Sequence, residues 1–131
     1  SSDLIEGYTR VRGGDVMEEP YTVNGDCLII HFKEELDHHL TEQLRGVIDS
    51  IIEKRGIRYI VMDFENQSFM DSSGIGFIMG RYKRIAPYKG RIYVTNLGRG
   101  LERIFKIAGL YTITVEKDSV EAALYEAGGR R

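Results

Sequence analysis

The sequence has few of the residues on which several classes of protein depend. It contains one cysteine, Cys27, so no disulfide can form within the chain, and a lone thiol is typical of a reducing compartment. The net charge of −2 gives no overall attraction to nucleic acid or to an anionic membrane surface. No apolar run approaches the roughly 20 residues of a membrane-spanning helix. We therefore expect a cytoplasmic protein that binds neither membranes nor nucleic acid directly.

Residue patterns typical of enzymes are also missing. The chain has no P-loop, no zinc-ligand spacing and no Gly-x-Ser-x-Gly elbow. His38 and His39 are adjacent, and side chains of adjacent helical residues point about 100° apart, so the two do not readily share a metal ion. Residues 74–76 (Gly-Ile-Gly) begin like a dinucleotide-binding motif, but Met79 stands where its third glycine belongs. We predict no catalytic residues, no metal and no cofactor.

The 131 residues suffice for one domain with a single core, and 42% of them are hydrophobic, as in an average globular protein. Residues 1–18 are rich in glycine and charge without an apolar period, so we interpret them as an extension, partly of artificial origin. The compact domain is expected at residues 19–127. Residues 128–131 (Gly-Gly-Arg-Arg) would form a tail.

Strand and helix patterns alternate along the compact domain. Residues 21–32 predict a hairpin that turns at Asn24-Gly25. Helical spacing follows at residues 40–52, with Asp37 placed to cap the helix and Gly56 placed to end it. Further strands are expected at residues 57–64, 91–94 and 111–115, and helices around residues 75–82, 101–108 and 120–127. This order predicts an α/β fold with a mixed, mainly parallel sheet, an N-terminal hairpin and four helices.

Two of these helices allow more specific predictions. The spacing of Ile75, Ile78, Met79 and Tyr82 predicts that all four lie on the buried face of the second helix. Asp118, three residues before a glutamate, is expected to cap the last helix.

The junction before the second helix is the most informative segment. Residues 71–74 (Asp-Ser-Ser-Gly) follow a parallel strand and begin a helix, at the edge where open α/β sheets usually meet ligands and partners. Helix capping explains a polar residue here. However, the segment has more capping groups than one helix needs, and residues 69–70 (Phe-Met) bring apolar bulk to an exposed connection. A phosphate on one of these serines would add about −1.5 to −2 charges at the positive end of the helix dipole.

Residues 68–76 (Ser-Phe-Met-Asp-Ser-Ser-Gly-Ile-Gly), followed by residues 80–83 (Gly-Arg-Tyr-Lys), strongly resemble the STAS-domain anti-sigma factor antagonists. The resemblance is strongest to the anti-sigma F factor antagonists of endospore-forming bacteria. It extends to residues 35–39, 103–105 and 109–110, and overall from about residue 22 to residue 124. It implies the STAS fold.

The resemblance also implies a regulatory binding protein, not an enzyme. Such a protein binds an anti-sigma factor serine kinase when it is unphosphorylated, which releases the sigma factor. The kinase then phosphorylates the serine that matches Ser72, and a metal-dependent serine phosphatase reverses the reaction. The partner-binding residues implied by the match are Asp37, Asp71, Ser72, Ser73 and Gly74. The choice of Ser72 over Ser73 depends on the family match alone.

One departure and two alternatives accompany this interpretation. Lys33-Glu34 stand where the family usually has Thr-Gly, which places bulk and charge beside the expected docking surface.

The first alternative is a nucleotide-binding protein that uses the glycines near Ser72 as a phosphate cradle, although a phosphate-binding lysine is missing. The second is a STAS module of a larger signalling assembly that is never phosphorylated.

Overall fold

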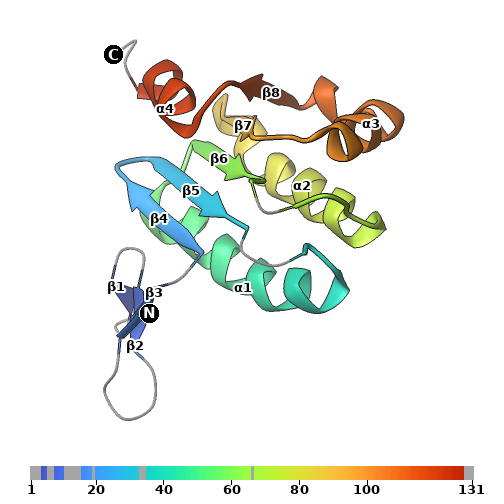
Figure 1. The fold of residues 1–131 in the computed structure, drawn as a ribbon. Helices are drawn as coiled ribbons and strands as arrows, with labels where there is room; N and C mark the ends of the chain where they lie inside the picture. Colours follow the sequence, from blue (N-terminus) through green and yellow to red (C-terminus); the bar gives the residue numbers. More distant parts are fainter. Residues whose placement is uncertain are drawn as a thin grey trace.

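The computed structural model describes residues 4–5, 8–10, 16–18, 20–32, 35–65 and 67–128. Its main feature is a five-stranded sheet covered by helices on both faces (Figure 1). The strands are β4 (Tyr21–Asn24), β5 (Cys27–His31), β6 (Tyr59–Asp63), β7 (Arg91–Thr95) and β8 (Thr114–Lys117). The helices are α1 (His38–Arg55), α2 (Ser72–Ile85), α3 (Arg99–Ala108) and α4 (Val120–Gly128), with short 3₁₀ turns η1 (Ala86–Tyr88) and η2 (Leu110–Thr112).

The strand order in this sheet is the order along the chain. β4 pairs with β5 antiparallel, and β5, β6, β7 and β8 pair in parallel, which confirms the predicted hairpin and mainly parallel sheet. Right-handed crossovers that always step in one direction place their helices on one face of a sheet. Accordingly, α1, α2 and α3 share one core, while α4 packs on the opposite face.

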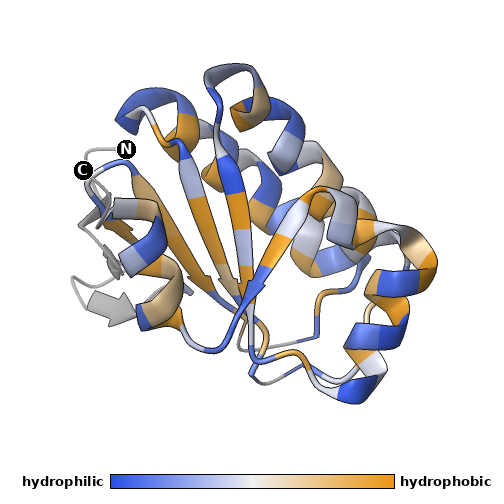
Figure 2. Ribbon diagram, turned by 90° about the horizontal axis from the view of Figure 1, so that it is seen from above, coloured by the Kyte–Doolittle hydropathy of each residue, from blue (hydrophilic) through white to orange (hydrophobic). Residues whose placement is uncertain are grey.

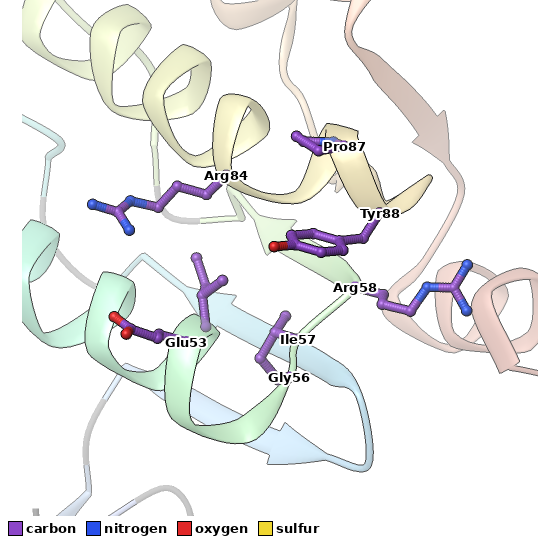
Figure 3. A pocket seen from close by; sticks show the side chains of 8 residues that line it. Glu53, Gly56, Ile57, Arg58, Arg84, Pro87 and Tyr88 are labelled. Atoms are coloured by element: carbon purple, nitrogen blue, oxygen red, sulfur yellow. The ribbon is translucent and has the colours of Figure 1, made fainter.

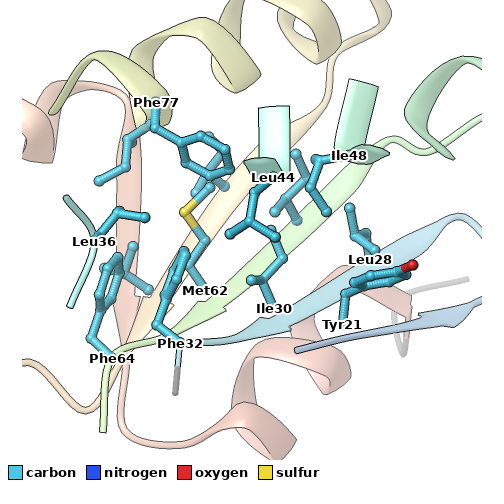
Figure 4. Packing of buried hydrophobic residues seen from close by; sticks show 14 of the residues in the cluster. Tyr21, Leu28, Ile30, Phe32, Leu36, Leu44, Ile48, Met62, Phe64 and Phe77 are labelled. Atoms are coloured by element: carbon cyan, nitrogen blue, oxygen red, sulfur yellow. The ribbon is translucent and has the colours of Figure 1, made fainter. Parts of the chain in front are cut away.

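The sheet is apolar on both faces because both are covered. In Figure 2 the central strands are mostly orange, whereas the helices carry both colours, as expected of helices with one face in solvent. The larger core, beneath α1 and α2, contains Phe32 stacked on Phe64 with ring centroids 4.9 Å apart, and Phe77 edge-on to Phe32 (Figure 4). Phe32 and Phe64 directly follow the ends of β5 and β6, and Phe77 reaches Phe32 from α2.

A second, smaller sheet precedes the first. β1 (Leu4–Ile5), β2 (Tyr8–Arg10) and β3 (Val16–Glu18) pair antiparallel in that order. The sequence, which lacks an apolar period here, did not predict these strands. The expected boundary between an extension and a domain at residue 19 remains a prediction, as does the tail, of which residues 129–131 lie outside the described part and Gly128 ends α4.

The hairpin turn is one residue later than predicted. Asn24 pairs with Cys27, so the two turn residues are Gly25 and Asp26, and Gly25 takes the positive φ of 64°. The Asp26 carbonyl accepts the N–H of Arg58 at 2.8 Å. This hydrogen bond connects the turn to the residue before β6. Asn24, Gly25 and Asp26 are all residue types that favour turns, so the sequence alone does not determine which two of them form it.

Three further predictions near the helices were wrong. The strand expected from residue 111 begins at Thr114, because η2 occupies the preceding residues. The cap of α4 is Ser119, whose hydroxyl accepts the Ala122 N–H at 3.0 Å, and not Asp118. Met79 is 42% exposed, because Phe77 and Arg81 occupy the buried face of α2 alongside Ile78.

Candidate functional site

The helices α1 and α2 begin side by side at the edge where the parallel strands end. A parallel bridge between Leu36 and Met70 joins the two segments that enter these helices. Each helix is capped by the aspartate that follows the bridge. Asp37 accepts the Leu40 N–H at 2.9 Å, as predicted. The bridge therefore sets two exposed carboxylates, Asp37 and Asp71, next to each other in register.

Asp71, and not a serine, is the side chain that caps α2. Its Oδ1 accepts the N–H of Ser73 at 2.9 Å and that of Gly74 at 3.4 Å. Ser72 is the first residue of the helix and is exposed, while Ser73 is half-buried. The Ser72 hydroxyl is thus at the surface and is not the group that caps the helix.

Gly74 is buried and permits the close approach of the two entrances. A Cβ at this position would lie 2.9 Å from the Cβ of Met70, 3.1 Å from its Sδ and 3.3 Å from Cδ2 of Leu36. Of the five predicted partner-binding residues, Asp37, Asp71 and Ser72 are exposed on one edge and Ser73 is partly so. Gly74 belongs to the packing beneath them. Since its N–H faces Asp71, it does not offer an open phosphate cradle.

Gln67 connects the two entrances, a role that was not predicted from the sequence. Its side chain is 5% exposed. Its Oε1 accepts the N–H of Leu36 at 2.9 Å, and its Nε2 donates to the carbonyl of Phe32 at 3.5 Å. One buried amide therefore connects the loop before α2 to the segment before α1. Lys33 and Glu34, which depart from the family pattern, lie outside the described residues.

An apolar side chain stands beside the polar edge. Phe69 is 56% exposed, although it directly precedes the buried Met70. The neighbouring Ser68 carbonyl lies so close to the start of α3 that a Cβ on Gly100 would be 2.7 Å from it. The backbone at Ser68 thus packs against α3 and the Met70 side chain is buried, while the Phe69 side chain between them is exposed to solvent near Asp71 and Ser72.

Asp63, at the end of β6, joins the ends of three strands. Its carboxylate accepts from His31 Nδ1 at 2.9 Å, Asn96 Nδ2 at 2.8 Å and the Glu65 N–H at 3.1 Å. Burial alone would raise the pKa of Asp63, but the hydrogen bonds from Asn96, His31 and Glu65 outweigh it and lower the pKa. Asn96 adopts a positive φ of 60° while it makes this contact. The same carboxylate thus anchors the first residues of the loop that carries Phe69 and Asp71.

An ion pair fastens α2 to α1 further from the edge. Arg81 is buried, and its Nε lies 2.8 Å from Oδ1 of Asp49. Its guanidinium also lies over the Phe77 ring, 4.8 Å from the centroid. Burial lowers the pKa of Arg81, and Asp49 opposes that shift. This pair therefore joins α1 to the second half of α2.

Neither a cluster of metal ligands nor a membrane-spanning helix is found in the described part of the chain. Among these residues, no three His, Cys, Asp or Glu side chains come together as ligands of a metal ion would. His38 and His39 are both exposed on the first turn of α1. None of the helices described is both long enough and apolar enough to span a bilayer.

Comparison with known proteins gives consistent results. A family model described as the STAS domain matches residues 20–123. The chain is 37% identical to the anti-sigma F factor antagonist of Paenibacillus polymyxa over 99 residues, which are 76% of this chain and 85% of the relative. It is also similar to the solved structure of the anti-sigma factor antagonist SpoIIAA in its unphosphorylated form, with 31% identity, a TM-score of 0.74, and coverage of 82% of this chain and 93% of that one. The structure of the Bacillus cell fate determinant SpoIIAA in the phosphorylated form gives a TM-score of 0.66 at 31% identity, over 81% of this chain and 95% of that one.

Proposed function

Since the chain belongs to the STAS-domain family, we propose that it is an anti-sigma factor antagonist and that phosphorylation of Ser72 switches it off. The observation that carries this proposal is the exposure of Ser72 at the start of α2, where Asp71 provides the cap. A kinase can reach this hydroxyl without unfolding the helix. The proposal is supported by two similar solved structures, one of the anti-sigma factor antagonist SpoIIAA in its unphosphorylated form and one of SpoIIAA in the phosphorylated form.

The chain acts as the acceptor in this reaction and not as an enzyme. Ser72 Oγ attacks the γ-phosphorus of ATP held by an anti-sigma factor serine kinase. The new O–P bond forms as the bond to the β-phosphate oxygen breaks, ADP leaves, and the hydroxyl proton passes to a base of the kinase. Water-driven hydrolysis of the phosphoserine by a serine phosphatase regenerates the hydroxyl. The whole cycle takes place in the cytoplasm.

A phosphate on Ser72 is compatible with the folded structure but weakens binding of the partner. It lies at the positive end of α2, where the helix dipole favours an anion. It adds about −1.5 to −2 charges beside Asp71 and Asp37. A partner that docks over Phe69 must desolvate this dianion, and a loss of about 3 kcal/mol already weakens binding more than a hundredfold.

The docking surface comprises Asp37, Asp71, Ser72, Ser73 and the exposed ring of Phe69, with Gly74 packed beneath. In the unphosphorylated state this surface binds the anti-sigma factor, which then releases its sigma factor. The relatives that support the assignment include anti-sigma F factor antagonists, so we place the protein in the regulation of sporulation.

The test is phosphorylation of the purified chain by its cognate anti-sigma factor kinase with ATP, followed by mapping of the modified residue by mass spectrometry. Ser72→Ala should abolish the modification, and the matched variant Ser73→Ala should retain it. A kinase that binds the chain but modifies Ser73, or neither serine, would overturn the proposal.

A further inference from the structure

The opposite end of the molecule carries a cavity that the proposed switch does not use. It has a volume of about 650 Å³ and lies between the C-terminal ends of α1 and α2 (Figure 3). Ile52 and Ile57 provide aliphatic walls, and Pro87 and Tyr88 face them from η1. A space of this size is within the range of natural ligand pockets.

Positive charge is concentrated around this cavity. The charged residues of its lining are Glu53, Arg58 and Arg84. The two segments that contribute the lining, residues 52–58 and 82–91, form what we call the basic end. They contain one acidic residue, Glu53, whereas the chain as a whole has more acidic than basic residues. Arg84, at the rim, contacts Asp49 through its Nε at 3.1 Å and still leaves 48% of its side chain exposed. The basic residues of this end are Lys54, Arg55, Arg58, Lys83, Arg84, Lys89 and Arg91.

Tyr88 is held over the cavity by an unusual backbone. Its side chain is 69% exposed. Lys89, the next residue, adopts a φ of 61°, a left-handed conformation that is unfavourable for a non-glycine residue. The following Gly90 is pressed so closely against the carbonyl of Arg58 that a Cβ would lie 2.3 Å from it. The fold thus maintains a strained turn that displays an aromatic ring to solvent.

We propose that the basic end docks an acidic segment of a partner protein, which inserts an aliphatic side chain into the cavity beneath Tyr88. The charge selects an acidic partner, and the aliphatic walls select an apolar anchor in place of a phosphate or a sugar. Nucleic acid and anionic lipid share the charge preference but have no aliphatic side chain to offer, so the cavity favours a polypeptide.

This site is independent of the proposed switch. α2 has 14 residues and runs from Ser72 at one edge to the basic end at the other, a distance of about 21 Å. A partner at the basic end therefore leaves Ser72 and Phe69 uncovered. The chain could hold two proteins at once, with the second neither competing for the switch surface nor affected by its phosphorylation.

The experiment is an NMR titration of the ¹⁵N-labelled chain with the synthetic peptide acetyl-Glu-Asp-Leu-Asp-Glu-amide. We expect saturable shifts confined to residues 52–58 and 82–91, and about tenfold weaker binding to Tyr88→Ala. The matched control is Tyr125→Ala, which removes a tyrosine of similar exposure (73%) from α4 and should bind as the unaltered chain does. A peptide with serine in place of leucine tests the anchor and should bind about tenfold more weakly.

Several results would overturn the proposal. One is the absence of saturable shifts at the basic end. Another is equal binding by Tyr88→Ala and the unaltered chain, and a third is equal affinity for the leucine and serine peptides. Tighter, Tyr88-dependent binding of a uridine oligonucleotide or of phosphatidylglycerol vesicles would assign the surface to those ligands instead. Phosphorylation of Ser72 is unaffected in every case, so failure here is distinct from failure of the switch.

Discussion

Replacement of Gln67 by methionine should loosen the connection between the entrances of α1 and α2. Methionine has nearly the same shape, so the packing is retained while the hydrogen bonds to Leu36 and Phe32 are lost. The Leu36 N–H then lies buried without its acceptor, which costs about 1–3 kcal/mol. We expect the free energy of unfolding to fall by roughly 2 kcal/mol, a large part of the 5–15 kcal/mol typical of a domain.

Urea unfolding measures the total loss, and amide hydrogen exchange locates it. Exchange at Leu36 should accelerate more than exchange at Val61 in the centre of the sheet, because the opened bond is local. The matched control is Gln43→Met, on the exposed side of α1, which should change stability by less than about 0.5 kcal/mol. If exchange at Leu36 rises no more than at Val61, Gln67 does not hold the two entrances together and the reasoning is refuted.

Three further predictions concern the same edge. Gly74→Ala should destabilise the protein by about 1–3 kcal/mol in thermal or urea unfolding, because its Cβ meets Met70 and Leu36, whereas Gly76→Ala, with open space around it, should not destabilise it in this way. Ser72→Asp should weaken binding of the anti-sigma factor in calorimetry but less than phosphate does, since it carries one charge; wild-type affinity would contradict the electrostatic explanation. Because the folded pKa of Asp63 is lowered, its stabilising contribution is present above the unfolded pKa of about 3.9 and is lost as pH falls through the folded value. Asp63→Asn should flatten the pH dependence of the urea midpoint below about pH 4, and an unchanged profile would exclude this role for the carboxylate.

Local features of the fold were predictable from the sequence. The caps at Asp37 and Gly56 were found because each depends on residues within one helical turn. The alternation of strands and helices sufficed to predict the parallel sheet, since crossover geometry leaves few other arrangements. The site residues were expected from the family resemblance alone, and their roles remain a prediction. The difference in exposure between Ser72 and Ser73 is visible only in the structure.

Features that depend on contacts between distant residues were not predictable. Gln67 acts on Leu36, 31 residues earlier, and a lone glutamine in a loop gives no sign of such a partner. The periodicity of α2 favoured Met79 for the core, because no sequence rule indicates that Arg81 is buried opposite Asp49. At the start of α4, Asp118 and Ser119 are both good caps, and only the path of the chain leaving β8 decides between them.

The assignment of the α2 cap to Asp71 has a consequence for how the inactive protein is stored. In the proposed switch the phosphate is placed on Ser72, which does not cap the helix, so the phosphorylated and unphosphorylated forms should have the same shape and the same resistance to proteases. Under that proposal, phosphorylated molecules would stay folded. Removal of the phosphate by a phosphatase would then restore the active form without new synthesis and without a refolding step.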